Sequence, residues 1–413
     1  MDVALLSVDN PHLIKRGGKH IHQLLLERGL REIGVNVHPI YPTIKYDPLP
    51  RRYFKYLLST LLKRDLLAPY QVRINHVLDS LLRTYALRSN EIRASDVLHF
   101  HDVVSLYAFI RSGIAIGSLP VVLTIHGYFS REFVDYNFVL KFLEKKLYLM
   151  LIDMEKRAVS TADLIIAADS RIKSYLVRTF GYPEEKIVVI PNAVDTSMFT
   201  PPTEDEIRSI RKTLGFSMEE FIVLVPRRLV QKNGVIYSVR AMEKIPPKYN
   251  IKLVIAGDGV ERAKIKREIE RLGLQERVVM LGSVPHERIV GYFKIADAVV
   301  IPSVTSHGVQ EATSLAALEA MSCGKPVIVT NVGGLTEIVD NYENGIIVPE
   351  RDAKAIADAL IKLYEHPDMA KSLGRKAREY VIEHHSYLSY SKRVLEIYER
   401  AIALSKYSAL DKT

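Results

Sequence analysis

Residues 298–330, AVVIPSVTSHGVQEATSLAALEAMSCGKPVIVT, contain the order of elements that decides the fold class. An apolar run ends at Ile301, an irregular loop follows, and a second apolar run begins at Val327. Between them Ser314 suits the N-cap of a helix over residues 315–322, because a serine hydroxyl can accept a hydrogen bond from a free N–H of the first turn. The stretch therefore predicts a strand, a helix and a second strand.

The same alternation of short apolar runs and amphipathic stretches extends along most of the chain and predicts parallel strands joined by helices. Adjacent prolines at 201 and 202 suit a linker. We expect one Rossmann-like domain over residues 1–195 and a second over 200–380, followed by a final helix over about 387–413. The expected strands cover residues 3–8, 35–40, 97–100, 121–125, 164–168, 187–190, 221–225, 251–256, 278–281, 298–301 and 327–330.

Composition limits the class of protein. The chain has 413 residues, of which 48% are hydrophobic and 25% charged, as in soluble globular proteins. Its formal net charge of +9 predicts attraction to anions, or only a basic surface. Cys323 is the single cysteine, which excludes an intrachain disulfide and a zinc cluster with two thiolates. The N-terminus has no signal-peptide pattern and no apolar run is long enough to span a membrane, so we expect a cytoplasmic protein.

Two carboxylates lie near the start of the helix expected at 315–322. Glu311 lies on the preceding loop and Glu319 on the helix itself. The free N–H groups at a helix start can bind phosphate oxygens, and carboxylates accept hydrogen bonds from sugar hydroxyls. The pattern favours a sugar nucleotide. The alternative is an acid that stabilises the helix dipole with an unrelated second acid.

A group of cations follows the strand expected at 221–225. Arg227, Arg228 and Lys232 lie where doubly wound folds bind their ligands, beyond the carboxyl end of a strand. Arginine can bind phosphate through two N–H groups, and lysine acts as a compact charge. The pattern favours binding of a diphosphate. A solvated charge cluster is the alternative.

These segments together resemble the family 4 glycosyltransferases. The resemblance lies in Glu311 with Glu319 eight positions on, in Arg227 with Lys232 five positions on, and in further stretches. It implies the GT-B fold, in which two Rossmann-like domains face one another across a cleft and the C-terminal helix returns to the first domain. The further stretches are residues 190–195, 256–259, 319–327, 333–339 and 344–349.

The resemblance also implies roles for the matched residues. Glu311 would contact the donor sugar and Glu319 the ribose hydroxyls. Arg227 and Lys232 would stabilise the departing diphosphate, together with the backbone N–H groups of Ser314 and Leu315. In the first domain, the Gly17-Gly18 pair would let backbone approach the phosphates, His126 would lie beside the donor sugar, and His101 would face the acceptor. A turn before a helix, and a buried structural histidine, are the alternatives for the glycine pair and for His126.

Membership implies transfer of a hexosyl group from a UDP-, GDP- or ADP-sugar to a hydroxyl acceptor, such as a glycan or a lipid-linked saccharide. The anomeric configuration would be retained, without a protein nucleophile. The chain has no Asp-x-Asp pair, so we expect no metal and no cofactor. Residues 312–314 read Ala-Thr-Ser where the family often has Gly-Phe-Gly, which leaves the donor sugar open.

Two further hypotheses concern partners. Residues 51–64 mix cations, aromatics and leucines, and as a helix they could lie on the inner face of a membrane, or pack their leucines on the domain. Nucleic-acid binding is disfavoured, since the cations are dispersed and no recognition motif is present. A nucleotide-sugar epimerase of similar architecture and a catalytically silent sugar-binding protein are the alternative functions.

Overall fold

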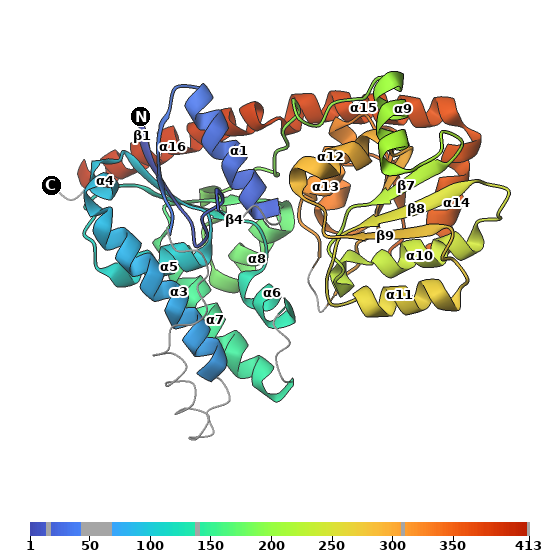
Figure 1. Ribbon diagram of the computed structural model, residues 1–413. Coiled ribbons are helices and arrows are strands. Elements are labelled where there is room, and N and C mark those ends of the chain that lie inside the picture. The colour runs from blue at the N-terminus through green and yellow to red at the C-terminus, as the bar shows by residue number, and fades with distance from the viewer. Residues whose placement is uncertain (14–17, 43–67, 137–140, 307–309, 411–413) are drawn as a thin grey trace. The chain divides into compact units, whose positions relative to one another are not determined.

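The computed structural model describes residues 1–13, 18–42, 68–136, 141–306 and 310–410. The chain divides into two compact units, one of Met1–Pro191 with Tyr390–Thr413 and one of Asn192–Ser389. Each unit contains one six-stranded sheet in which the paired strands are all parallel, with helices packed on it (Figure 1). The prediction of Rossmann-like sheets is confirmed.

The sheet of the first unit has the strand order β2-β1-β3-β4-β5-β6. Val3 of β1 pairs with Val37 of β2 on one side and with Val97 of β3 on the other. The strand order therefore reverses between β1 and β3, and ligands of doubly wound folds bind at such a point. The strands are β1 (Asp2–Leu6), β2 (Asn36–Ile40), β3 (Val97–Phe100), β4 (Val121–Ile125), β5 (Leu164–Ala167) and β6 (Ile187–Val189).

Two helices of the first unit begin with an aspartate side-chain cap. The carboxylate of Asp102 accepts the N–H of Ser105 at 2.7 Å, and Asp169 does the same for Ile172 at 2.7 Å. Such bonds satisfy N–H groups that the first turn leaves free. The helices are α1 (Gly18–Glu32), α3 (Ala68–Leu87), α4 (Ser89–Ala94), α5 (Val103–Ser112), α6 (Phe129–Tyr136), α7 (Lys141–Thr161) and α8 (Ser170–Phe180), with the 3-10 turn η1 (Glu184–Lys186).

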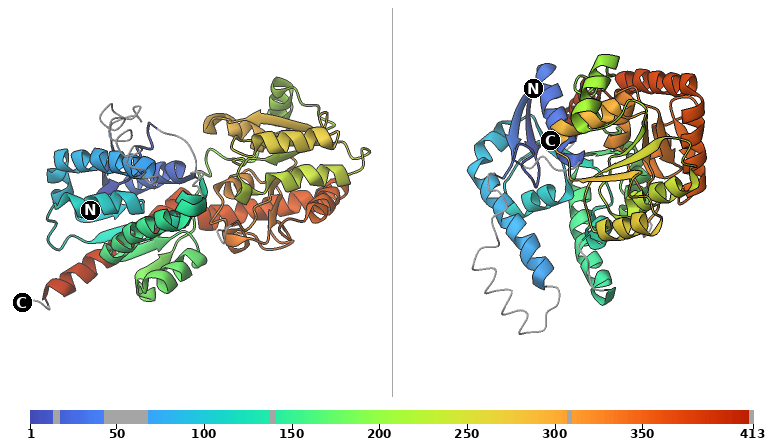
Figure 2. Two further views of the ribbon diagram at one scale, coloured as in Figure 1. Left: turned by 90° about the horizontal axis from the view of Figure 1, so that it is seen from below. Right: turned by 45° about the vertical axis from the view of Figure 1, so that its right-hand side comes forward.

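The last helix, α16 (Tyr387–Leu410), runs from its fourth residue within the first unit. The Tyr398 hydroxyl is hydrogen-bonded to Nδ1 of His99 on β3 at 2.6 Å, and Arg393 donates to the carbonyl of Val189 on β6 at 3.1 Å. Figures 1 and 2 show this red helix alongside the first sheet. These contacts join the last helix to the N-terminal sheet.

The second sheet has the order β12-β11-β10-β7-β8-β9, and here the order reverses between β7 and β10. Ile222 and Leu224 of β7 pack into one core layer and Val223 and Val225 into the other, since successive strand residues face opposite sides. Burial on both faces explains the uninterrupted apolar runs. The strands are β7 (Phe221–Val225), β8 (Ile251–Ala256), β9 (Val278–Gly282), β10 (Ala298–Ile301), β11 (Val327–Thr330) and β12 (Ile346–Val348).

One helix of the second unit begins with a complete capping box. Thr203 and Glu206 form a reciprocal capping box at the start of α9, and Gly215 ends it with φ 77°. The helices are α9 (Glu204–Leu214), α10 (Val235–Lys244), α11 (Arg262–Arg271), α12 (His286–Ile295), α13 (Leu315–Ser322), α14 (Ala353–Glu365) and α15 (Pro367–His385), with the 3-10 turns η2 (Gln231–Asn233) and η3 (Gly333–Glu337).

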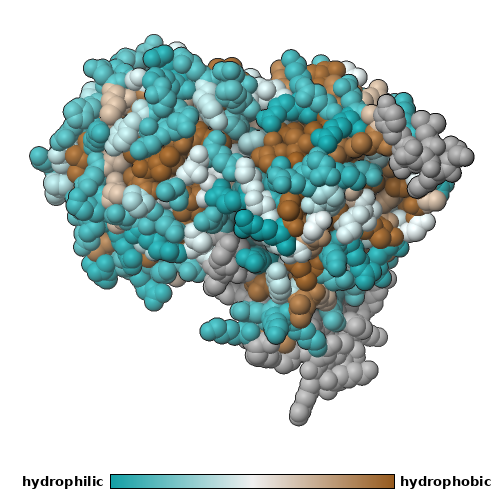
Figure 3. All heavy atoms as spheres, turned by 180° about the vertical axis from the view of Figure 1, so that it is seen from behind, coloured by the Kyte–Doolittle hydropathy of each residue, from teal (hydrophilic) through white to brown (hydrophobic). Residues whose placement is uncertain are grey.

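The described part of the chain contains no observation that supports the hypothesis of membrane contact. None of the helices described there is both long and apolar enough to cross a bilayer. Residues 51–64 lie outside the described residues. On the face shown in Figure 3, hydrophilic side chains predominate and hydrophobic ones form separate patches.

Candidate active site

The candidate site of the second unit lies where the strand order reverses. Arg227 follows β7, and its guanidinium donates hydrogen bonds to side chains from three other segments. Nη1 donates to Ser314 Oγ at 3.0 Å, and Nη2 donates to Glu311 Oε2 at 2.7 Å, Asn233 Oδ1 at 2.6 Å and Ser303 Oγ at 3.2 Å. Because β7 and β10 are neighbours in the sheet, the segments after them meet at one edge.

Arg227 and Glu311 form a buried ion pair, with side chains 9% and 12% exposed. Burial raises the pKa of the Glu311 carboxyl, but the charges of Arg227 and Lys232 outweigh this and hold the pKa below its usual value. Glu311 is therefore ionised at neutral pH. The site combines a compensated charge pair with a second nearby cation.

Two glycines support the loop that carries Glu311. The N–H of Gly334 donates to the Glu311 carbonyl at 2.8 Å. Gly333 has φ +68°, and a Cβ there would lie 1.9 Å from the same carbonyl oxygen. Only glycine permits this approach. Close contact with the Glu311 loop therefore explains the two glycines at the start of residues 333–339.

Ser314 and Leu315 are at the start of α13, where a phosphate site was expected. Ser314 takes the N-cap position, but its side chain makes no capping hydrogen bond and accepts from Arg227 instead. The prediction of a serine side-chain cap is wrong, because a charged guanidinium is a stronger donor than a backbone N–H. Leu315 is the first helical residue.

Glu319 lies further along α13 and is 8% exposed. Its Oε1 is 3.0 Å from Nε2 of His286, the first residue of α12. Burial raises the pKa of the Glu319 carboxyl. Burial lowers the pKa of His286, but the bond to Glu319 outweighs this and the net shift is upward. The ring of Phe199 packs edge-on against His286 at 5.5 Å between centroids. Glu319 is thus held in place by a side chain that sequence reasoning missed.

The predicted residues of the first unit lie at its own strand ends. His101 follows β3 and His126 follows β4, and their rings stack with centroids 5.9 Å apart. Gly18 is the first residue of α1, whereas Gly17 lies outside the described residues. His101 and His126 therefore come together, in a different unit from Arg227 and Glu311.

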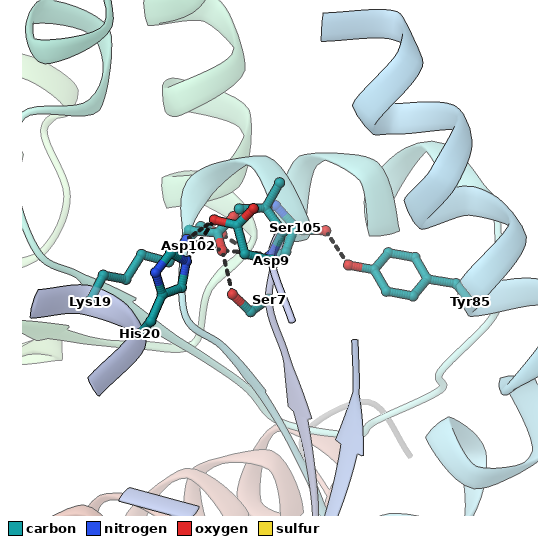
Figure 4. Close-up of polar contacts among 8 residues, drawn as sticks. Ser7, Asp9, Lys19, His20, Tyr85, Asp102 and Ser105 are labelled. Carbon is teal, nitrogen blue, oxygen red and sulfur yellow. Dashed lines mark hydrogen bonds and ion pairs between the residues drawn. The ribbon is translucent and has the colours of Figure 1, made fainter. Parts of the chain in front are cut away.

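Next to His101, the carboxylate of Asp102 accepts hydrogen bonds from the end of β1 and from α1 (Figure 4). It accepts from Ser7 Oγ at 3.1 Å and from Lys19 Nζ at 3.1 Å. Asp9 contacts the same lysine at 3.7 Å and lies 3.0 Å from Nε2 of His20. These contacts fix the segments on either side of the point where the first sheet reverses its order.

Comparison with known proteins now identifies the family. The model of group 1 glycosyl transferases matches residues 206–380, and that of family 4 glycosyltransferases matches residues 16–198. This chain belongs to the family 4 glycosyltransferases. The matched ranges fall in both units and include every site residue predicted above.

Curated relatives of this glycosyltransferase match over part of their length. An uncharacterized glycosyltransferase of Methanocaldococcus jannaschii is 32% identical over 58% of this chain and 60% of its own. A D-inositol 3-phosphate glycosyltransferase of Xylanimonas cellulosilytica is 32% identical over 50% of this chain and 49% of its own. The match thus spans about half to three fifths of these relatives.

Solved structures support the fold over nearly the whole glycosyltransferase chain. Sucrose-phosphate synthase of Thermosynechococcus elongatus superposes with a TM-score of 0.74 at 22% identity, covering 98% of this chain and 99% of the other. HepE of Anabaena, solved in complex with UDP, gives 0.69 at 20% identity over 96% and 99%. These superpositions confirm the GT-B fold that the sequence predicted.

Sequence reasoning on this glycosyltransferase missed three residues of the second unit. Asn233 and Ser303 hold Arg227, and both lie inside stretches whose neighbours were singled out. A small polar side chain after a strand is a weak signal, because such residues are common in loops. His286 has no signal in its own segment, since its partner Glu319 is 33 positions away.

Proposed function

We propose that the chain is a retaining hexosyltransferase that moves a hexosyl group from a nucleotide-diphosphate sugar to a hydroxyl acceptor. The observation that carries the proposal is the position of Arg227 at the β7/β10 switch point, bonded to both Glu311 and Ser314. It places a cation, an ionised carboxylate and a helix N-terminus at one edge of a sheet. Family membership supplies the class of reaction.

The electrostatics suit a diphosphate leaving group. Negative charge grows on the diphosphate as the bond to the sugar breaks, and Arg227 with Lys232 would stabilise it. The start of α13, at Ser314 and Leu315, would add backbone N–H donors. Because Arg227 is already fixed by four side-chain partners, little reorganisation would accompany the reaction.

The two glutamates would have separate roles. The ionised Glu311 would accept hydrogen bonds from hydroxyls of the donor sugar. Glu319, oriented by His286, would accept from the ribose hydroxyls. Neither is proposed as a nucleophile. In the reaction the bond from the anomeric carbon to the phosphate oxygen breaks, the acceptor oxygen bonds to that carbon from the same face, and the leaving phosphate takes the acceptor proton.

In the first unit, the proposed substrate contacts are Gly17 and Gly18 with phosphates, His126 with the donor sugar, and His101 with the acceptor. The acceptor is proposed to be a glycan or a lipid-linked saccharide. For the lipid-linked form, residues 51–64 would bind the inner face of a membrane in an otherwise cytoplasmic protein. Flotation with anionic liposomes at low salt tests this contact, and absence of co-flotation would remove it.

Isothermal titration of UDP-, GDP- and ADP-sugars into the full chain tests the donor proposal. The structural neighbour HepE is solved with UDP-glucose, so UDP-glucose is the first probe. We expect one class to bind at micromolar concentration and UDP, GDP or ADP alone to compete. Binding of none of the three classes would contradict the proposal.

Proton NMR of the product then tests the reaction. An α-linked product from an α-linked donor is expected, and no turnover of the sugar without acceptor. A β-linked product would overturn retention. Interconversion of the donor sugar without any acceptor would indicate the epimerase instead.

A further inference from the structure

Three histidines from different elements of the first unit converge beyond the ends of β3 and β4. His22 lies on α1, His101 follows β3 and His126 follows β4. One ring nitrogen of each can be chosen so that all three lie within 4.8 Å of one another. The ring centroids of His22 and His126 are only 4.9 Å apart.

Two of these rings are buried without hydrogen-bond partners. His22 is 1% exposed and His101 is 0% exposed. Among the described residues, neither nitrogen of either ring has a partner. A buried polar atom left in this state costs the folded protein its full desolvation free energy. Such groups are few in native structures, and each requires an explanation, such as a catalytic role, an ordered water or a bound ion.

The neighbouring His99 shows what a structural histidine looks like in the same place. Its Nδ1 is 2.6 Å from the Tyr398 hydroxyl and its Nε2 is 2.7 Å from Thr124 Oγ1. Both of its nitrogens are therefore used. Its ring packs against His101 at 4.5 Å between centroids and supports it from one side. His22 and His101 differ from His99 in this respect.

Two of the imidazoles are also in the right chemical state for a metal ion. Burial and the neighbouring imidazoles lower the pKa of His22 and of His101, so both rings are neutral at physiological pH. A neutral imidazole keeps the lone pair that a metal ion needs. His126 is partly exposed.

We propose that His22, His101 and His126 bind a divalent transition-metal ion, with Zn²⁺ as the representative. Three imidazoles with one open position are a known zinc ligand set. Ligand nitrogens around zinc lie roughly 3.4 Å apart, so small rotations of the rings close the site. The three histidines lie in a different unit from Arg227 and Glu311. Two of them, His101 and His126, are also the substrate contacts proposed above, so a bound ion and the substrate would compete for them. The proposal departs from the expectation, made from the sequence, that the chain binds no metal, and zinc binding can be measured without transfer activity.

The surroundings of the rings set the expected strength. A metal-bound histidine usually donates its second N–H to a carboxylate or a carbonyl, and loss of this bond weakens binding by about 10–100-fold. In the described part of the chain, the rings of His22 and His101 lack such a partner. We therefore expect the affinity for Zn²⁺ to be about 10–100-fold weaker than that of a fully supported three-histidine site.

Calorimetric titration of Zn²⁺ alone into the untagged, chelator-treated full chain tests the proposal. We expect one ion per chain, and Co²⁺ in its place should give the visible absorption of four-coordinate cobalt. The variants His22→Gln and His101→Gln should each weaken binding at least tenfold. His384→Gln is the matched control, because His384 is an exposed histidine on α15 and should bind as the wild type does.

A second measurement covers a variant that folds poorly. Zn²⁺ should raise the Tm of the wild type and of His384→Gln, and it should leave the Tm of His22→Gln unchanged. The half-buried His126→Gln is the variant least exposed to folding defects and should lose the shift as well. Absence of Zn²⁺ binding to the wild type, or wild-type binding in both His22→Gln and His126→Gln, would overturn the proposal.

Discussion

The two sheets of this glycosyltransferase have similar topology but carry opposite chemistry at their strand ends. In the second unit, Arg227 and Glu311 bring full charges into a buried site and neutralise each other. In the first, His22 and His101 are buried as neutral rings, and their nitrogens have no hydrogen-bond partner among the described residues. A parallel sheet determines where a ligand can bind, whereas the side chains after each strand determine which ligand.

The two sites differ in how their buried ionisable side chains avoid an unpaired charge. A buried charge must be paired, so Glu311 keeps its charge only through Arg227 and Lys232. A buried imidazole can instead lose its proton and its charge, as the lowered pKa of His22 indicates. The charged site of the second unit, with its two cations, suits binding of an anion such as a diphosphate. The cluster of neutral histidines suits binding of a metal ion, which accepts the lone pairs of the ring nitrogens.

The largest expected effect is on the charged site. Glu311→Ala should lower kcat/KM by about 1000-fold or more, because it removes a sugar contact and leaves Arg227 buried without its counter-charge. Zn²⁺ binding by the first unit should be unchanged. Steady-state kinetics and zinc titration of one preparation measure both.

Glu379→Gln, at an exposed glutamate paired with Arg375, is the control for Glu311→Ala and should retain activity. Near-normal transfer by Glu311→Ala would break the contrast between the two sites.

Arg227→Ala should have the second largest effect. We expect it to lose about 3 kcal/mol of transition-state stabilisation, which is roughly 150-fold in kcat/KM. The guanidinium is proposed to meet the departing diphosphate, so the affinity for the free nucleoside diphosphate should fall too. Arg375→Ala, at an exposed arginine, serves as the control. A loss in KM alone, with kcat intact, would argue against a role in the transition state.

A smaller effect is expected from the glycine beneath Glu311. Gly333 and Gly113 both have φ +68°, but an added Cβ meets the Glu311 carbonyl at 1.9 Å in the first case and nothing within 4 Å in the second. Gly113→Ala should therefore cost only the backbone strain, about 1–2 kcal/mol, and Gly333→Ala roughly 2 kcal/mol more.

Thermal unfolding and titration of the donor nucleotide measure the glycine pair. Only Gly333→Ala should also weaken donor binding. Equal losses of stability in the two variants would show that the close approach of residue 333 to the Glu311 carbonyl adds nothing to the cost of the substitution.

The smallest effect concerns pH and has opposite sign in the two regions. The pKa of His286 is raised by its bond to Glu319, so its stabilisation is present below about pH 6.5 and is lost as the pH rises through the folded-state value. The advantage of wild type over His286→Gln, about 1 kcal/mol, should shrink as the pH rises above about 6.5.

For His22 the pKa is lowered, so stability is instead lost as the pH falls below about 6.5. The advantage of wild type over His22→Gln should shrink towards acid pH. Tm measured against pH for the three proteins checks both signs. Parallel curves for the two variants would contradict the contrast.

Much of the fold could be predicted because fully buried strands leave a clear apolar run. The runs at 97–100, 121–125 and 221–225 have the same ends in sequence and structure. The strand β12 was missed, since its three residues, Ile346–Val348, are too few to separate from a loop. The side-chain cap at Ser314 was wrong because its hydroxyl has a charged partner elsewhere in the chain.

The sequence by itself determined the order of strands and helices, the positions of the cations and carboxylates after their strands, and the resemblance to the family. Tertiary structure decided which of these residues meet. Arg227 reaches Glu311 across 84 positions only because β7 lies beside β10 in the sheet. The histidine cluster likewise requires α1, β3 and β4 to be assembled. Strand order arises from packing of the whole chain, and no local pattern of residues encodes it.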